Sequence, residues 1–239
     1  MYPKVVIQLN DIIENMKMAK ESCEKHHVKL SVVTKLLSDQ KEIVSALVEN
    51  GVDCICDSKI ANLISYQELK VEKWLIRLPS LSEVSEVVTY ADASLNSELS
   101  TIKALNEEAF KQEKIHKVIL MYEIGDLREG CLKEELRHVL RECLTLKNIE
   151  VYGIAVNLSC YGEIIPDDDN MNDLATTVSE LEKEFQMKFT IVSGGNSSSY
   201  PMLSQGMLPA CINNLRIGET IYLGRVPCIE EEVPELHHH

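Results

Sequence analysis

The sequence predicts an α/β fold, a (β/α)8 barrel in which eight parallel strands close into a ring and helices cover the outside. Short apolar runs alternate with amphipathic helical stretches along the chain, and this alternation indicates a parallel sheet. Eight such runs follow the first helical stretch. The length of 239 residues is also close to the roughly 250 that a barrel of this kind uses as a single domain.

The N-terminal segment is expected to lie outside the barrel. Residues 4–9 are apolar enough for a leading strand. A helix should follow from Asn10 or Asp11 to about Glu24, because either side chain can accept hydrogen bonds from the free N–H groups of a first turn. This strand and helix would precede the eight repeating units.

The eight units follow from apolar runs and from helical periodicity. Residues 29–35 are rich in β-branched side chains, which suit a buried parallel strand. Between the strands, apolar residues recur at helical spacing. The predicted strands are 29–35, 52–57, 74–78, 92–96, 117–124, 150–158, 189–193 and 214–217, and the predicted helices are 39–50, 58–67, 81–89, 98–112, 132–145, 170–184 and 198–205.

Composition and charge exclude several classes of protein. The formal net charge of −14 argues against a nucleic-acid partner, whose binding depends on lysine and arginine side chains that neutralise phosphates. No apolar stretch approaches the roughly 20 residues that a membrane span needs, so no membrane attachment is expected. The N-terminus lacks the features of a secretion signal. We therefore expect a cytoplasmic protein.

The eight cysteines are dispersed, and we expect them to be reduced, with no metal site in the protein. Cys54 and Cys56 alternate along a predicted strand, and they are expected to face opposite sides, which would prevent them from sharing a metal ion. We assign residues 1–228 to the barrel and residues 229–239 to a tail. The last residues, Leu236 to His239, resemble an expression tag.

Lys35 is the first candidate for chemistry, because it ends the first predicted barrel strand and barrel active sites lie at the C-terminal ends of strands. An amine there can form a Schiff base with a carbonyl group. A lysine at a strand end is as often only a solvated charge, so the assignment depends on its neighbours. Other strand-end candidates are Asp57, Arg77, Asn96, Arg128 and Asn157.

The segment Ser193–Ser199, which contains Asn196 and Ser197, indicates a phosphate site. It is a glycine turn that opens a helix, where backbone N–H groups and hydroxyls can hold a phosphate dianion. An ordinary helix-capping loop uses the same residue types. Gly218, one strand later, favours the phosphate interpretation, because the last two βα loops of a barrel frequently bind phosphate.

Arg216 lies between this turn and the barrel mouth. Its apolar neighbours Leu215 and Ile217 argue against a simple surface ion pair. The lysine, the phosphate turn and the arginine together suggest pyridoxal 5'-phosphate (PLP). If Arg216 faces the pyridine nitrogen, its permanent charge prevents protonation of that nitrogen and favours simple removal and return of a Cα proton.

The chain resembles the N-terminal barrel of the alanine racemase family of PLP enzymes and, within it, the ornithine-racemising branch. The resemblance reaches to about Arg225 and rests on motifs spread along the chain. These are Met1-Tyr2-Pro3-Lys4, Asp57-Ser58, Leu95-Asn96-Ser97-Glu98-Leu99, Gly125-Asp126-Leu127-Arg128-Glu129-Gly130, Val156-Asn157-Leu158, Cys160-Tyr161-Gly162 and Val192 through Ser199. The resemblance implies a fold-type III barrel that lacks the C-terminal β domain of these enzymes.

The resemblance also implies roles for individual residues. Lys35 corresponds to the lysine that bonds to the cofactor and serves as a base. Arg128 corresponds to the arginine beside the cofactor's phenolic oxygen, and Arg216 to the partner of the pyridine nitrogen. Ser197, with the backbone around Gly218 and Glu219, corresponds to contacts with the phosphate.

Two positions depart from the alanine racemases and argue against alanine as the substrate. Asn157 stands where those enzymes place a histidine against the cofactor ring, and Asp39 stands where they have a tyrosine that touches the phosphate. The resemblance therefore implies a racemase for ornithine or another basic amino acid. Its full-length form is expected to be a homodimer in which a tyrosine from the neighbouring subunit supplies the second acid-base group.

A second function remains open at this point. Single-domain PLP homeostasis proteins are non-catalytic carriers with a similar barrel and nearly this length. They typically have a Gly-Glu-Asn-Tyr string after the second barrel strand, whereas this chain has Cys56-Asp57-Ser58-Lys59. The full reading frame of the gene discriminates the two functions, because only the racemase continues into a second domain.

Overall fold

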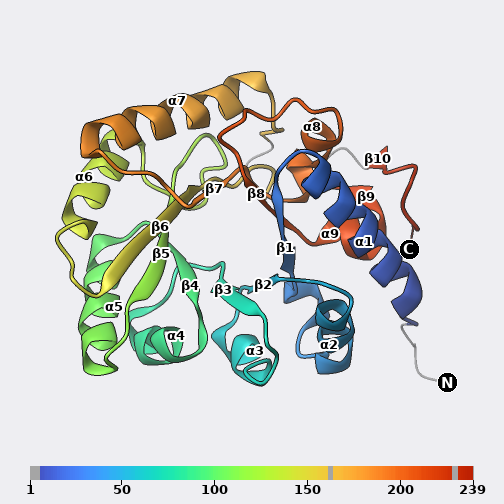
Figure 1. The fold of residues 1–239 in the computed structure, drawn as a ribbon, viewed down its shortest axis with the longest axis horizontal. Coiled ribbons are helices and arrows are strands. Elements are labelled where there is room, and N and C mark those ends of the chain that lie inside the picture. Colours follow the sequence, from blue (N-terminus) through green and yellow to red (C-terminus); the bar gives the residue numbers. More distant parts are fainter. Residues whose placement is uncertain (1–5, 161–163, 228–230, 239) are drawn as a thin grey trace.

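The computed structural model describes residues 6–160, 164–227 and 231–238, and it shows a closed barrel of eight parallel strands with helices on the outside (Figure 1). The predicted fold class is confirmed. The barrel strands are β1 (Lys29–Val33), β2 (Cys54–Asp57), β3 (Glu72–Leu75), β4 (Ala93–Asn96), β5 (His116–Met121), β6 (Ile149–Ala155), β7 (Ile191–Ser193) and β8 (Asn214–Ile217).

The helices follow the strands in regular alternation. A short antiparallel pair, β9 (Arg225–Val226) and β10 (Glu231–Glu232), lies outside the barrel. The helices are α1 (Leu9–Lys25), α2 (Lys41–Glu49), α3 (Ile60–Ser65), α4 (Val84–Tyr90), α5 (Leu99–Lys111), α6 (Lys133–Cys143), α7 (Asp168–Phe185), α8 (Tyr200–Ser204) and α9 (Glu219–Leu223). The sequence did not predict α9, because a helix of five residues shows too little periodicity to be recognised.

The ring closes between its first and last strands. Lys29 of β1 pairs with Asn214 of β8, and the parallel register continues to Val32 opposite Ile217. Asn214 strengthens the closure with its side chain, whose Nδ2 donates to Ser31 Oγ at 2.8 Å. Ring closure removes the exposed sheet edges that an open sheet would leave.

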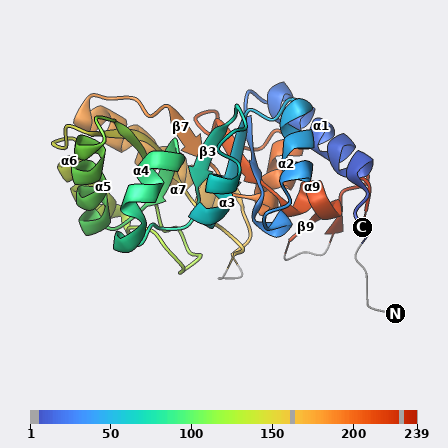
Figure 2. The same cartoon turned by 90° about the horizontal axis from the view of Figure 1, so that it is seen from below.

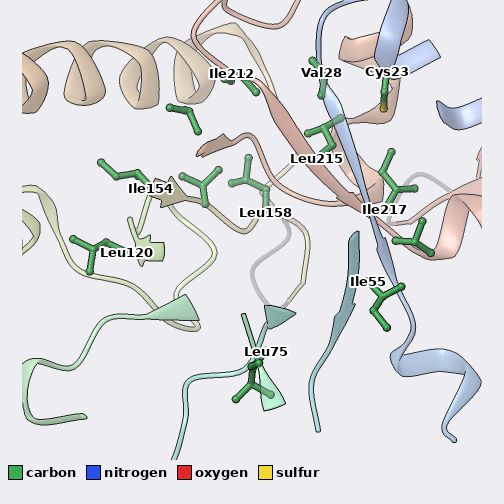
Figure 3. Close-up of a cluster of buried hydrophobic side chains, with 14 of the residues drawn as sticks. Cys23, Val28, Ile55, Leu75, Leu120, Ile154, Leu158, Ile212, Leu215 and Ile217 are labelled. Atoms are coloured by element: carbon green, nitrogen blue, oxygen red, sulfur yellow. The ribbon is translucent and has the colours of Figure 1, made fainter. Parts of the chain in front are cut away.

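Alternation along the strands creates two apolar cores. One fills the barrel interior and includes Cys54, Cys56 and Trp74. The other lies between strands and helices and includes Ile55 and Leu75, which Figure 3 shows among the buried side chains of that layer. The expectation that Cys54 and Cys56 face opposite sides is therefore wrong, because residues two apart on a strand point to the same face.

The first helix differs from its prediction. Residues 6–8, the described part of the predicted leading strand, are not a strand, and α1 begins at Leu9. Gln8, rather than Asn10 or Asp11, is the N-cap residue, and no side chain caps the helix. α1 packs against α9 on one side of the barrel, as Figures 1 and 2 both show.

The described part of the tail also packs against α1. Val233 and Leu236 are buried. Asn15 of α1, which is fully buried, donates from Nδ2 to the carbonyl oxygens of Ile221 and His237 at 3.1 and 2.9 Å. Its Oδ1 accepts from the His237 backbone N–H at 2.7 Å. The tag-like end is therefore in contact with the body of the fold.

Three further properties concern only the described residues. The seven cysteines among them are free thiols. None of the helices in these ranges is both long and apolar enough to cross a membrane. Within the same ranges, no cluster of three or more His, Cys, Asp or Glu side chains is arranged to hold a metal ion.

Candidate active site

A cavity of about 240 Å³ lies at the C-terminal ends of the barrel strands. Residues at or just beyond the C-terminal ends of β1, β2, β3, β5, β6, β7 and β8 line it, together with Pro227 after β9. All eight residues that the sequence assigned to the site border this one cavity, namely Lys35, Arg128, Asn157, Asn196, Ser197, Arg216, Gly218 and Glu219.

Lys35 begins a 3-10 turn, Lys35–Leu37, two residues after β1 ends, so the predicted strand 29–35 is shorter in the structure. Asp57 explains why the strand ends here. The buried Thr34 hydroxyl donates to Asp57 Oδ2 at 2.7 Å, and Thr34 N–H donates to Cys56 O at 2.8 Å. These two contacts anchor the chain at Thr34, and the exposed Lys35 side chain is presented to the cavity.

Asp57 is therefore a structural residue of the turn. It is fully buried, and its second oxygen accepts from the Lys59 backbone N–H at 2.9 Å and from Asn62 Nδ2 at 3.0 Å. Its carboxylate connects the ends of β1 and β2 with the start of α3. Asp57 itself does not line the cavity.

The turn after β7 and the start of α9 meet at one corner of the cavity, which we call the anion-binding corner because it contains the groups predicted to hold a phosphate. Asn196 caps the 3-10 turn Ser197–Ser199 by accepting from the Ser198 N–H at 2.8 Å. The Ser197 hydroxyl oxygen accepts from the backbone N–H groups of Gly218 and Thr220 at 3.2 and 3.3 Å. Backbone N–H groups and a hydroxyl thus converge where the β7 and β8 loops meet, as a phosphate requires.

Glycine is needed at position 218 for reasons of space. A Cβ atom there would lie 3.0 Å from Val33 Cβ and 3.1 Å from the Val33 carbonyl oxygen. Because β8 packs directly against β1 at this point, a side chain would push the two strands apart. The close approach keeps the backbone of Gly218 at the wall of the cavity.

Arg216 is buried, with 2% of its surface exposed, so the alternative of a surface ion pair is wrong. Its guanidinium donates to Ser193 Oγ at 2.5 Å, to Val156 O at 2.8 Å and to Asn157 Oδ1 at 2.6 Å. All three acceptors are neutral. Burial lowers the pKa of Arg216 from its ordinary value.

Arg128 and Glu129 complete this wall. Arg128 Nε lies 3.0 Å from Glu129 Oε2, and Asn157 Nδ2 donates to Glu129 Oε1. Glu129 was not among the residues predicted for the site, although it lies next to Arg128 in the Arg-Glu-Gly string. Only the path of the β5–α6 loop, where Leu127 and Gly130 have φ angles of 54° and 126°, brings its carboxylate to Asn157.

Two other strand-end candidates lie apart from the cavity. Arg77 donates to both carboxylate oxygens of Glu83 at 2.8 and 2.7 Å. Asn96 is buried and donates to Ser94 Oγ at 2.9 Å. Both residues support neighbouring loops and strands, so their position at a strand end did not indicate a site.

Comparison with known proteins identifies relatives with the same barrel. The family model "Alanine racemase, N-terminal domain" matches residues 7–226. The ornithine racemase of Acetoanaerobium sticklandii is 45% identical over 234 residues, which are 98% of this chain and 66% of that protein. The lysine racemase of Thermotoga maritima is 32% identical over 226 residues, 94% of this chain and 63% of that protein. The chain thus spans less than two thirds of the length of these curated relatives.

Solved structures show the same fold. An alanine racemase from Clostridium difficile 630, in complex with cycloserine, has a TM-score of 0.75 at 17% identity and covers 95% of this chain and 64% of its own. PipY of Synechococcus elongatus PCC7942, without PLP, also has a TM-score of 0.75 at 17% identity, with 88% and 99% coverage. D-threonine aldolase from Filomicrobium marinum has a TM-score of 0.79 at 13% identity, with 100% and 68% coverage.

The family assignment rests on nearly the whole chain. The family model covers the barrel from the N-terminus of α1 to the end of β9, and both curated relatives align over more than nine tenths of the sequence. The chain therefore belongs to the alanine racemase family of PLP-dependent enzymes and comprises the N-terminal barrel of that family.

Proposed function

We propose that this chain is the cofactor-binding barrel of a PLP-dependent racemase that acts on ornithine or another basic amino acid. One observation carries the proposal: Lys35, the anion-binding corner and the buried Arg216 border a single cavity. The two curated relatives support the substrate class, because their names describe racemases of ornithine and lysine.

The residues that border the cavity suit PLP chemically. Lys35 offers an exposed primary amine for the cofactor's aldehyde. Ser197 and the backbone N–H groups at Gly218 and Thr220 would hold the phosphate group. Arg216 and Arg128 present positive charge to the remainder of the cofactor. PLP, when bound, withdraws electrons from the Cα–H bond of an amino acid.

Lys35 would act at its Nζ atom, which takes a proton from one face of the amino-acid Cα or returns one to it. Arg216 keeps its charge in this arrangement, because a guanidinium does not lose its proton under ordinary conditions. It therefore orients its partners without taking part in proton transfer. Its hydrogen bonds to Ser193 and Asn157 limit its movement during turnover.

Racemisation needs a proton-transfer group on each face of Cα. The described residues that line the cavity include neither tyrosine nor histidine. We propose that the second group is a tyrosine from a C-terminal domain of the neighbouring subunit in a homodimer. The family resemblance supports this arrangement, and the curated relatives are longer than this chain.

We further propose that the protein is cytoplasmic and binds no nucleic acid. The free thiols of the described cysteines suit a reducing compartment. The net charge of −14 would repel a polyanion.

The test is to follow L-ornithine, L-lysine and L-alanine by chiral chromatography with the full-length protein loaded with PLP. We expect the D-form of a basic amino acid to accumulate and alanine to react more slowly. The barrel by itself should be slower by a factor of about 10² to 10⁴, because one acid-base group is missing. If the full-length, PLP-loaded protein converts none of the three, the carrier function becomes the better explanation.

A further inference from the structure

Glu129 connects the polar side chains of the cavity wall into a continuous row. Its Oε1 accepts from Asn157 Nδ2, and its Oε2 lies 3.0 Å from Arg128 Nε. Asn157 Oδ1 accepts in turn from Arg216 at 2.6 Å. The Glu129 side chain is 14% exposed, against 40% for Arg128, so its carboxylate is the more enclosed member of the ion pair. We call this row, Arg128–Glu129–Asn157–Arg216, the Glu129 relay.

We infer that Glu129 is a positioning residue, which fixes the orientation of the Asn157 amide and provides the counter-charge for both arginines of the cavity. The inference rests on the proposed function, because it concerns the cavity to which PLP is assigned. It adds a role for a residue that need not touch the cofactor, since Glu129 would act through Arg128 and Asn157.

The orientation of Asn157 follows from the hydrogen-bonding capacity of its two neighbours. An ionised carboxylate can only accept hydrogen bonds, and a guanidinium can only donate them. Asn157 therefore has to direct its NH₂ group to Glu129 and its oxygen to Arg216. The reversed amide would place oxygen against carboxylate and NH₂ against guanidinium, so both contacts would become repulsive. Glu129 thereby keeps an acceptor directed at Arg216.

Glu129 also balances the charge of the buried Arg216. The acceptors that contact it are neutral, and Glu129 is the carboxylate one side chain away. Burial lowers the pKa of Arg216, and interactions with Cys56, Cys160 and Glu129 act in the opposite direction. A buried charge without compensation is unfavourable, so the negative charge of Glu129 helps to keep the guanidinium in place.

Other charged or titratable groups also face this cavity. Lys35, Arg128, Cys160, Arg216 and Glu219 line it. Glu219 pairs with Arg225 at 3.0 Å, so its charge is already compensated. The Cys160 backbone N–H donates to Asp126, which places a further carboxylate near the wall. Glu129 differs from Glu219 and Asp126 because it contacts two side chains that line the cavity, Arg128 and Asn157.

Glu129→Gln separates this role from mere packing, because glutamine has almost the same shape but only one acceptor end. If the glutamine oxygen faces Asn157, the glutamine NH₂ group faces Arg128, and that arginine loses its acceptor. If its oxygen faces Arg128, its NH₂ group faces Asn157, which must then turn its own NH₂ group toward Arg216. One arginine loses its partner in either arrangement.

A second substitution should restore the row. In the double variant Glu129→Gln/Asn157→Asp, the glutamine oxygen accepts from Arg128 and its NH₂ group donates to the new carboxylate at position 157. The other oxygen of that carboxylate accepts from Arg216. Every hydrogen bond is satisfied again, and the total charge equals that of the wild type. The negative charge has moved by one side chain.

The experiment measures the PLP dissociation constant by absorbance titration, and the pH at which the near-visible absorption of the PLP-loaded chain changes. Glu182→Gln is the matched control. Its side chain is 13% exposed and also pairs with a cation, Lys188, but it precedes β7 at the opposite end of the barrel. Thermal unfolding verifies that each variant is folded.

We expect Glu129→Gln to bind PLP about 10- to 100-fold more weakly, the usual effect of losing a hydrogen bond to a charged group. Its spectral change should move to lower pH, because removing a negative charge disfavours a proton on the Lys35 nitrogen when that nitrogen is bonded to PLP. The double variant should return both quantities to within a few-fold of the wild type. Glu182→Gln should change neither.

Two outcomes would overturn the inference. One is a Glu129→Gln variant that matches Glu182→Gln in both PLP affinity and spectral pH dependence. The other is a folded double variant that is no better than Glu129→Gln, and this comparison also serves if the single variant is too unstable to titrate. If the wild-type chain binds PLP and either result is found, only the role of Glu129 fails. If the wild-type chain binds no PLP, the proposed function fails first.

Discussion

The two ends of the barrel balance the charges of their cationic side chains in different ways. At the N-terminal end, the Lys117 ammonium lies 3.7 Å from Glu72 and 4.2 Å from the centre of the Tyr152 ring, so the cation has both a carboxylate and an aromatic face. At the C-terminal end, Arg216 is surrounded by neutral acceptors, and its compensating carboxylate belongs to another residue of the wall. Charge that is balanced locally stabilises the fold, whereas charge that is balanced at a distance can interact with a ligand.

The largest expected effect tests this contrast on two lysines, one at the start of β1 and one just beyond its end. Lys35→Ala removes the amine at the C-terminal end of β1, and Lys29→Ala removes the amine at its N-terminal end. Borohydride reduction with PLP followed by peptide mapping should label Lys35 in the wild type and in Lys29→Ala. Lys35→Ala should show no label, and turnover by the full-length enzyme should fall by a factor of about 10² to 10⁴. A label on another lysine in the wild type would contradict the assignment of Lys35.

His116, the first residue of β5, concerns the stability of the fold at the N-terminal end of the barrel. Burial, with a smaller effect of Lys114, lowers the pKa of His116 to about 4. Ser94 Oγ lies 2.8 Å from His116 Nε2 and accepts from Asn96 Nδ2 at 2.9 Å, so its own hydrogen is available to an unprotonated Nε2. The neutral imidazole is therefore the form that the fold accommodates.

The sign of the pH effect follows from linkage. The unfolded chain takes up a proton at His116 below about pH 6.5, whereas the folded chain does so only near pH 4. Stability is therefore full above pH 6.5 and falls between pH 6.5 and 4, by roughly 3 kcal/mol at most. Urea unfolding of the wild type and of His116→Gln at several pH values measures this. An equal pH slope in both proteins over this window would exclude His116 as the cause.

A smaller effect is expected at the anion-binding corner. Ser197→Ala removes the hydroxyl that accepts from Gly218 and Thr220 N–H, and PLP affinity should fall by roughly 1.5–3 kcal/mol if that hydroxyl also contacts the phosphate. Ser204→Ala in α8 is the control, because its exposed hydroxyl only donates to Pro201 O. Isothermal titration with PLP compares the two variants. Equal affinities would mean that the phosphate binds elsewhere.

The smallest effect is expected from the locally balanced pair. Lys117→Met should destabilise the chain by about 1 kcal/mol or less, because Lys117 and Glu72 are both about one third exposed and such pairs contribute little. PLP affinity should remain unchanged. Denaturant unfolding and a PLP titration check both points. A marked loss of PLP affinity in Lys117→Met would show that the two barrel ends are coupled, which would break the comparison.

The fold was predictable because β-branched runs and amphipathic stretches repeat eight times, and the bounds of β8 were predicted without error. The other strands lie where they were predicted, but most begin or end at different residues. The predicted strand 29–35 is too long, because Asp57 pulls Thr34 into a turn. That contact joins segments 23 residues apart, and no local pattern reveals it.

The lining of the cavity was predictable where a residue type and a strand end coincide, as for Lys35 and Arg216. Glu129 could not be found in this way, because its role depends on contacts across 28 residues and on the left-handed backbone of the β5–α6 loop. The error over Cys54 and Cys56 had a different origin. Adjacent residues on a strand face opposite sides, so Cys54 and Cys56, which are two apart, face the same side. The strand itself was correctly placed.

The closure of the ring has a consequence for synthesis on the ribosome. β1 finds its second neighbour only when β8 exists, because Asn214 Nδ2 reaches Ser31 across 183 residues. Asn15 meets the His237 backbone across 222 residues. Until those residues emerge, the outer edge of β1 has unsatisfied N–H and C=O groups, and such an edge can pair with another nascent chain. Closure of this barrel therefore has to wait until β8 has left the ribosome, and the nascent partial barrel is the state that a chaperone would have to protect.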